Sequence, residues 1–391
     1  MRIYTTITAA MLALVAGQAA EAQSLASRVA AVRDGKVRMT FASRDDICGW
    51  GNGISTRGDR NNWNYRDDDN RNGDVEYDRE CSEGPARVVI EMDRGQPVAM
   101  RAYVGGRWRP SSGVTDLGAV GVREATTWLM SVAGSSTSKV ASSAIFATTL
   151  ADSVDMAASL NDFARNDSKP EEAREQAIFW MSQIDDDKVD GYLERLLRES
   201  RNSDIQDKAI FGLSQRGSDR AKKVLRDFVM NENASTKLRG QAIFWLGQGK
   251  RGESPEYLRD LYSRVESEDL KDKVIFSISQ QRGPETEKWL LDLVSNKSEP
   301  MEMRKKALFW AGQGGAGTTK LAALYEKMNE REMKDQMIFA LSQKRDGAAL
   351  DKLMDIARND PDREARKKAM FWLGQSKDPR VTQMLSDIIN R

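Results

Sequence analysis

Phenylalanine and glutamine recur together along this chain, at a spacing that could bind a peptide backbone. In seven heptads similar to Ala-Ile-Phe-Trp-Leu-Gly-Gln, residues 242–248, a glutamine follows a phenylalanine by four residues. Residues four apart on a helix share one face, and a glutamine amide both donates and accepts hydrogen bonds. The pairs are Phe179 and Gln183, Phe211 and Gln215, Phe244 and Gln248, Phe276 and Gln280, Phe309 and Gln313, Phe339 and Gln343, and Phe371 and Gln375.

A lysine or a glutamine stands three residues before each phenylalanine, and the lysines are Lys208, Lys273, Lys306 and Lys368. Each copy would therefore present a long side chain, an aromatic ring and an amide on one face. Two interpretations are open. Each ring could lean on the neighbouring helix while each glutamine ties a loop or helix end, or rings and amides together could line a groove for an extended peptide chain. The second makes all these residues candidate partner-binding positions.

Composition excludes much enzyme chemistry. The chain has no histidine, which removes histidine triads, histidine metal sites and the most common proton shuttle near neutral pH. Its formal net charge is +1, so no strong field would recruit nucleic acid. We therefore predict a non-catalytic protein without a cofactor and without a nucleic-acid partner.

One segment has a weak metal signature. Asp68, Asn70, Asn72 and Asp74 follow the opening of a calcium-binding loop, in which alternate oxygens surround the ion. Position twelve should be a bidentate glutamate but is Arg79, and no flanking helices are predicted. A solvated turn is the favoured interpretation, and Ca²⁺ binding is the alternative.

The first 22 residues resemble a secretory signal peptide: Arg2 precedes an apolar stretch, and Ala20-Glu21-Ala22 suits the cleavage site. We expect a periplasmic or secreted protein with no transmembrane segment after cleavage. In an oxidising compartment the only two cysteines, Cys48 and Cys81, are expected to form a disulfide.

Two regions with different periodicity follow. Residues 23–113 are expected to form a small β-rich cap, because residues 36–43, 86–93 and 97–106 read as strands, with a turn at Asp93-Arg94-Gly95 between the last two. From Val114 to Arg391 the pattern predicts helices.

Internal repetition defines the helical region. The seven phenylalanines are 30 to 33 residues apart, and Phe146 marks an eighth, degenerate copy. Each copy divides into two helices, such as residues 218–231 and 235–248. The sequence thus predicts a mainly α protein, an α-solenoid of about eight helix pairs over residues 114–391.

Five residues in one copy carry a family resemblance. Leu238, Arg239, Ala242, Leu246 and Gly247 resemble the second helix of bacterial HEAT-like, armadillo-type repeats, and residues 365–374 repeat the pattern. The resemblance implies a solenoid whose second helices line a concave surface. It implies little about function, because such arrays include scaffolds, transport factors, lyase subunits and hydroxylases. The hydroxylases use His-Glu metal ligands, which this chain lacks.

The helical periodicity also predicts side-chain directions. Phe244 lies about 160° from Leu246 on a helical wheel, so its ring should leave the core face. The residue after the phenylalanine alternates: Trp180, Trp245, Trp310 and Trp372 in odd copies, Gly212, Ser277 and Ala340 in even ones. We expect these large and small residues to interdigitate in the core.

Together these features predict an exported, non-catalytic scaffold that binds protein or peptide partners along a concave phenylalanine and glutamine ladder. The alternative is an enzyme, possibly metal-assisted, with its site where the β cap meets the solenoid, near residues 67–78.

Overall fold

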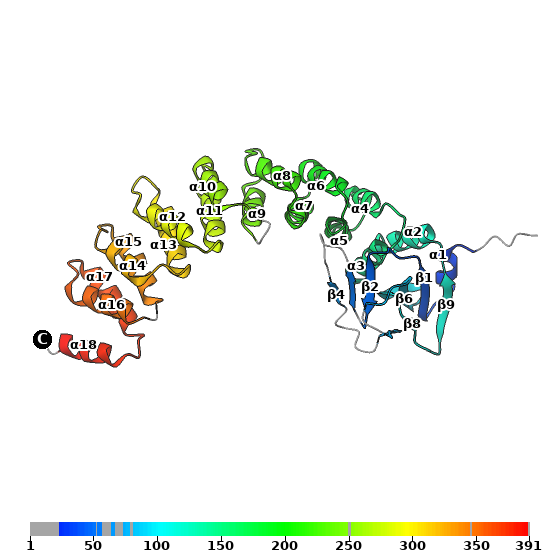
Figure 1. Ribbon diagram of the computed structural model, residues 1–391, viewed down its shortest axis with the longest axis horizontal. Helices are drawn as coiled ribbons and strands as arrows, with labels where there is room; N and C mark the ends of the chain where they lie inside the picture. The colour runs from blue at the N-terminus through cyan, green and yellow to red at the C-terminus, as the bar shows by residue number, and fades with distance from the viewer. Residues whose placement is uncertain are drawn as a thin grey trace, which may run out of the picture. The chain divides into compact units, whose positions relative to one another are not determined.

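The computed structural model describes residues 23–51, 53–56, 64–66, 73–78, 81–248, 252–344 and 346–389 of the 391-residue chain. The chain divides into two compact units, Met1–Asp185 and Asp186–Arg391 (Figure 1). The boundary between the units falls within the helical repeats. The expected signal segment, residues 1–22, lies outside the described residues.

The β-rich part of the first unit is built on a four-stranded sheet with strand order β7-β6-β1-β9. A three-stranded sheet, β2-β3-β4, and a two-stranded one, β5-β8, accompany it among the described residues. The three strands predicted from sequence are confirmed as β1, β6 and β7. The strands are β1 (Gly35–Phe41), β2 (Ile47–Trp50), β3 (Gly53–Thr56), β4 (Asn64–Arg66), β5 (Val75–Glu76), β6 (Ala86–Asp93), β7 (Gln96–Val104), β8 (Arg107–Trp108) and β9 (Val114–Ala119).

The predicted turn joins β6 to β7 as a two-residue hairpin. Asp93 pairs with Gln96, and the two residues between them have positive φ, 50° at Arg94 and 78° at Gly95. Positive φ at both central residues is the signature of the turn that matches the twist of a hairpin. The alternating pattern on β1 buries Val37, Met39 and Phe41.

The helical prediction was wrong for the first residues of its range. Val114–Ala119 forms β9, which pairs in parallel with β1, so the β-rich part extends to Ala119 and the helices of the repeat begin at Val122. The backbone hydrogen bonds of β9 go to a strand about 80 residues earlier in the chain. A local periodicity cannot reveal such a long-range pairing.

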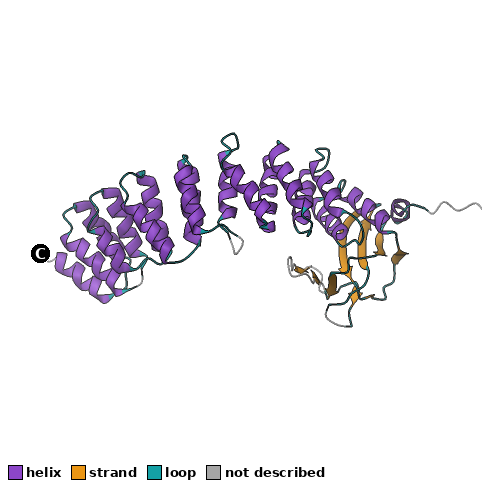
Figure 2. Ribbon diagram, turned by 45° about the horizontal axis from the view of Figure 1, so that its top comes forward, coloured by secondary structure: helices purple, strands orange, loops and turns teal. Residues whose placement is uncertain are grey.

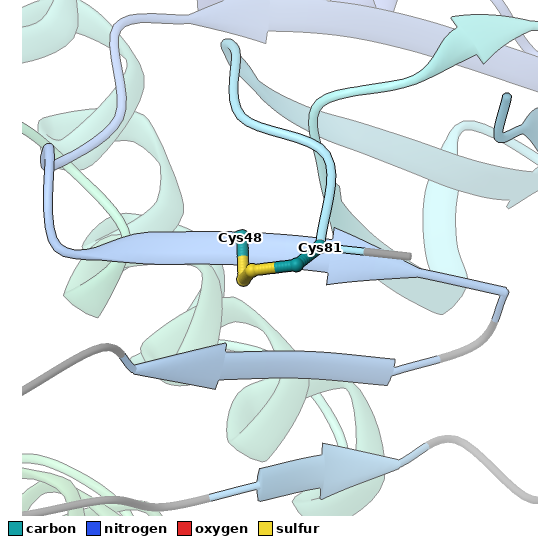
Figure 3. Close-up of a disulfide and its surroundings, with 2 residues drawn as sticks. All are labelled: Cys48 and Cys81. Atoms are coloured by element: carbon teal, nitrogen blue, oxygen red, sulfur yellow. A yellow bond between two sulfur atoms is a disulfide. The ribbon is translucent and has the colours of Figure 1, made fainter. Parts of the chain in front are cut away.

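The predicted disulfide is confirmed. Cys48 on β2 bonds to Cys81, which precedes β6, with 4.8 Å between the two Cα atoms (Figure 3). Cys48 is buried. The bond closes a loop of 33 residues, and in the chain-entropy model a loop of that size contributes about 3 to 4 kcal/mol.

The first unit also contains α1 and two helix pairs. In the repeat pairs, α2 packs on α3 and α4 packs on α5. Phe146 of the degenerate copy lies on α3 and is buried. The helices are α1 (Leu25–Ala30), α2 (Val122–Ala133), α3 (Ser138–Thr149), α4 (Met156–Arg165) and α5 (Glu171–Ser182).

The second unit is an α-solenoid of stacked helix pairs, as predicted (Figure 2). Second helices pack on their neighbours to form one layer, and first helices form the other. In the described part of the chain no helix is both long and apolar enough to span a membrane. The first helices are α6 (Lys188–Glu199), α8 (Asp219–Val229), α10 (Pro255–Arg264), α12 (Pro284–Ser295), α14 (Thr318–Tyr325) and α16 (Gly347–Asn359), and α18 (Pro379–Ile389) follows. The second helices are α7 (Ser203–Arg216), α9 (Thr236–Leu246), α11 (Glu268–Gln280), α13 (Met301–Gln313), α15 (Arg331–Ser342) and α17 (Arg363–Leu373).

An arginine, buried at Arg304 and half-buried at Arg239, ties the two helices of a pair together in odd copies. Arg239 Nε donates to the carbonyl of Val229, 2.7 Å away, and Arg304 Nε donates to that of Val294 at 2.9 Å. Carbonyls in the last turn of a helix lack a partner within the helix. The arginine of the HEAT-like pattern therefore satisfies the end of the first helix.

Small residues let successive second helices approach closely. A Cβ atom placed on Gly247 at the end of α9 would lie 2.5 Å from Ser277 Cβ on α11. At the equivalent position on α13, a Cβ atom on Gly312 would lie 3.4 Å from Ala340 Cβ, which is an ordinary contact. Ser277 and Ala340 of even copies thus face glycines of the preceding odd copies, which corrects the predicted interdigitation of large and small volumes at these two positions.

We expect Gly247→Ala to destabilise the second unit by about 1 to 3 kcal/mol, because the added methyl group forces α9 and α11 apart. Gly312→Ala is the matched control and should be neutral or stabilising, because alanine favours helix and the site has room. Urea unfolding followed by circular dichroism measures both. Equal stability of the two variants would contradict the close approach of α9 and α11.

A reducing agent should lower the melting temperature of the β-rich part, because the disulfide no longer restricts the unfolded chain. The double variant Cys48→Ala/Cys81→Ala should melt at the lower temperature with or without reductant. Differential scanning calorimetry measures the change. A melting temperature of the wild-type protein that does not change with reductant would show that the disulfide contributes no stability.

Candidate partner-binding face

The structure places each recurrent phenylalanine on a second helix and none of them in the buried core. Phe179, Phe211, Phe244, Phe276, Phe309 and Phe339 are half-buried, and Phe371 on α17 is 59% exposed. None of the seven rings is wholly enclosed between helices. The wheel prediction that these rings leave the core is therefore compatible with the structure, which also gives them contacts that the wheel could not supply.

Aromatic rings of the second unit form a continuous chain from α7 to α17. Neighbouring centroids lie between 4.9 and 6.5 Å apart. These separations are in the range that aromatic pairs prefer. In order, the rings are Phe211, Trp245, Phe244, Phe276, Trp310, Phe309, Phe339, Trp372 and Phe371. In the first unit Trp180 contacts Phe146 and Phe179.

The spacing of the phenylalanines alternates along this chain. Phe244 stacks on Phe276 with 5.9 Å between centroids and 12° between planes, and Phe309 stacks on Phe339 at 6.5 Å and 7°. Trp310 separates the two stacked pairs and contacts both Phe276 and Phe309 edge to face. The repeating element of the face is thus two helix pairs, in agreement with the alternation in the sequence.

The tryptophans are less buried than predicted. Trp180 in the first unit is 8% exposed, but Trp245, Trp310 and Trp372 are half-buried. Each indole lies between two phenylalanine rings, so it belongs to the layer of the phenylalanines and not to the core between the helix layers. Trp310 accordingly lines a surface hollow.

The glutamines fall into two groups. Gln280 Nε2 donates to the Ser279 hydroxyl at 3.2 Å, and that hydroxyl donates to the Phe276 carbonyl at 2.6 Å. The same relay holds Gln183, Gln215 and Gln343. In this arrangement the Gln280 amide oxygen is the group available to accept a hydrogen bond.

In the other three copies glycine replaces the serine before the glutamine, at residues 247, 312 and 374. Within the described residues the Nε2 atom of Gln248 is buried and has no hydrogen-bond partner. The face therefore offers an exposed amide acceptor at Gln280 on α11, whereas the amide nitrogen of Gln248 lies below the surface.

Ion pairs join even copies to the odd copies that follow. Lys306 Nζ lies 3.4 Å from Asp272 Oδ1, and Lys368 Nζ lies 3.9 Å from Asp335 Oδ2. These aspartates stand four residues before the phenylalanine, a position acidic in the even copies. Two of the predicted lysines are thus partly neutralised within the face.

A hollow of about 690 Å³ opens on this face across α9, α11 and α13. Its aromatic lining comes from the rings of Phe244, Phe276, Phe309 and Trp310. Its polar lining comes from Thr236, Lys237, Gln241, Asp269, Asp272, Lys273 and Lys306. A volume of this size suits a ligand or several side chains of a peptide.

Sequence analysis missed Lys237, Gly240 and Asp269, which line the hollow. A signal for one of them was present. The position four residues before the phenylalanine holds a charged residue in the other six copies and Gly240 in this one.

Only one of the weak calcium candidates, Asp74, belongs to the described part of the chain. Asp68, Asn70 and Asn72 lie outside the described residues, and Asp74 accepts hydrogen bonds from Lys36 Nζ and the Tyr103 hydroxyl. The described residues contain no group of three or more Cys, Asp or Glu side chains placed to hold a metal ion.

A second hollow, of about 470 Å³, lies in the first unit between α2 and α4. Its lining includes Arg123, Met130, Asp162 and Phe163. It contains none of the predicted binding residues.

Comparison with known proteins adds little. No family model matches the chain, and no curated protein matches it. Human deoxyhypusine hydroxylase in complex with glycerol is similar over 59% of this chain and 88% of its own, at 16% identity and a TM-score of 0.28. A structure from work on computationally designed self-assembling cyclic homooligomers covers 69% of this chain and 92% of its own, at 16% identity and a TM-score of 0.12. At these scores no argument rests on either similarity.

The chain's own geometry defines its class. It is an α-solenoid of repeated helix pairs with a small N-terminal β region.

We expect Phe276→Ala to lower the free energy of unfolding of the second unit by about 2 kcal/mol, because Phe276 contacts both Phe244 and Trp310. Phe371→Ala is the control and should cost less than about 1 kcal/mol, since that ring is mostly exposed. Urea titration gives both values. Equal costs would mean that the ring chain does not contribute to stability.

Proposed function

We propose that this protein is an exported, non-catalytic, HEAT-like scaffold that binds an extended segment of a protein or peptide partner along the face of its second helices. The observation that carries the proposal is the hollow over α9, α11 and α13, which combines half-buried aromatic rings with amide and charged groups. Binding pockets commonly combine a mostly apolar lining with a few placed polar groups.

The HEAT-like assignment rests on residues with a structural role. The arginine of the pattern, Arg239, bonds to the end of the preceding helix, and Gly247 permits close approach of the next second helix. Paired helices that recur every 30 to 33 residues are the general feature of such solenoids. This supports the resemblance seen in the sequence, beyond the plain α-solenoid.

A peptide backbone is the ligand whose chemistry fits the amides best. Gln280 is exposed, and its amide oxygen can accept from a backbone N–H. Each aromatic ring of the hollow packs on neighbouring rings and is half-buried. The partly covered rings supply apolar contact for side chains without sequence-specific geometry, as expected of a surface that binds extended chains.

The two interpretations of the ladder are compatible in this proposal. Contacts from ring to ring hold neighbouring second helices together, which is the packing role of the first interpretation. The remaining surface of the rings lies open in the hollow, which is the binding role. A ring held on two sides by other rings also loses little freedom when a ligand arrives, and this lowers the entropic cost of binding.

Export remains an expectation from residues 1–22. A disulfide between the only two cysteines supports it, since such bonds persist in oxidising compartments. The alternative of an enzyme near residues 67–78 stays a prediction as well, because half of that loop, residues 67–72, lies outside the described residues.

The proposal is tested by selecting peptides from a random display library against the purified protein. Gln280→Ala should lower the affinity for the selected peptides about 2- to 10-fold, because it removes one hydrogen bond. Lys288→Ala on α12, in the other helix layer, is the matched exposed control and should leave affinity unchanged. Isothermal calorimetry measures both. Peptides that bind both variants as tightly as the wild type would place the site elsewhere.

A further inference from the structure

The hollow lies where the repeat departs from its own pattern. The other copies carry a charged side chain four residues before the phenylalanine, and α9 carries Gly240 there. A Cβ atom on Gly240 would lie 3.3 Å from Lys273 Cγ. The aliphatic part of Lys273 therefore crosses α9 at Gly240, and a larger residue at 240 would push it aside.

The charges around the hollow are not balanced by one another. Asp272 lies within ion-pair distance of Lys306, at 3.4 Å. Among the described residues neither Lys237 nor Lys273 has a carboxylate partner, although both line the hollow. Two ammonium groups without a carboxylate partner thus share the hollow with the aromatic rings that line it.

Asp269 is the one other carboxylate of the hollow, and its position limits its effect. It stands in the first turn of α11, where the free N–H groups of a helix offset negative charge. Lys237 and Lys273 line the same hollow as Asp269, so they would repel a cationic ligand group that binds there. The unpaired charges therefore favour an anionic group over a cationic one.

We infer that the hollow anchors an acidic side chain, glutamate or aspartate, of the extended peptide that the proposed function assigns to this face. The carboxylate lies between the ammonium groups of Lys237 and Lys273, and its methylene groups contact the rings of Phe244 and Phe276. Lysine acts here as a point charge on a long stem, so it adapts to either acidic side chain. The inference rests on the proposed function and specifies its ligand.

The test uses capped peptides of about twelve residues, long enough to cross three helices spaced about 9 Å apart. They are composed of threonine, serine and leucine and differ at one central position, which is glutamate, glutamine or lysine. Blocked termini exclude binding through a free C-terminal carboxylate. Calorimetry at low and at high salt gives the affinities for the full-length protein.

We expect the glutamate peptide to bind about 5- to 10-fold more tightly than the glutamine peptide at low salt, and this preference to shrink at high salt. Lys273→Gln and Lys237→Gln should each reduce the preference to less than about 2-fold. Lys288→Gln is the matched control: Lys288 is exposed on α12 and pairs with Asp292 at 3.1 Å. It should leave the preference intact.

The ratio between two peptides is insensitive to the fraction of folded protein, so a destabilised variant cannot imitate the result. Equal affinity for all three peptides would overturn the inference that the hollow binds an acidic side chain, and it would leave the proposed function unaffected. Tightest binding of the lysine peptide would overturn it in favour of the carboxylates Asp269 and Asp272. Binding of none of the peptides would overturn both the anchor and the proposed function.

Discussion

The contact between successive second helices is the constraint on which the rest of this structure depends. A single helix pair cannot bury its apolar faces, so each pair needs the next. Close approach is possible at Gly247 because a side chain there would collide with Ser277. That approach sets the distance at which Phe244 stacks on Phe276, and the stacked pair in turn supports Trp310. Backbone spacing, ring order and surface shape are therefore consequences of the same few small residues.

Packing and recognition share the same side chains on this face. Half-buried rings contribute to stability through their neighbours and present the rest of their surface to the hollow. The serine relay does the same for the amides: Ser279 fixes Gln280 to the end of its own helix and leaves the amide oxygen available. Such groups are held in place before a ligand arrives, which is the arrangement that a binding surface needs.

Sequence periodicity predicted the helix pairs, the three main strands and the disulfide, because each depends on local pattern or on the only two cysteines. It could not predict β9, whose partner is distant in the chain, or the paired spacing of the rings. A helical wheel gives the direction of Phe244 but not the distance between α9 and its neighbours. The ion pair between Asp272 and Lys306 also depends on that distance. The hollow was missed because Lys237, Gly240 and Asp269 in its lining do not belong to the recurrent pattern.

The absence of a side chain at Gly240 has an energetic meaning. A glycine inside a helix costs about 1 kcal/mol relative to alanine, and Gly240 lies well within α9. Lys237 and Lys273, which have no carboxylate partner among the described residues, line the same hollow. The departure from the repeat at Gly240 therefore lowers the stability of α9, and it occurs beside the two unpaired ammonium groups. Natural sequences depart from the local rules of folding mainly where a function offsets the lost stability. Gly240, where the repeat pattern is broken, therefore indicates which part of the phenylalanine and glutamine ladder selects its ligand.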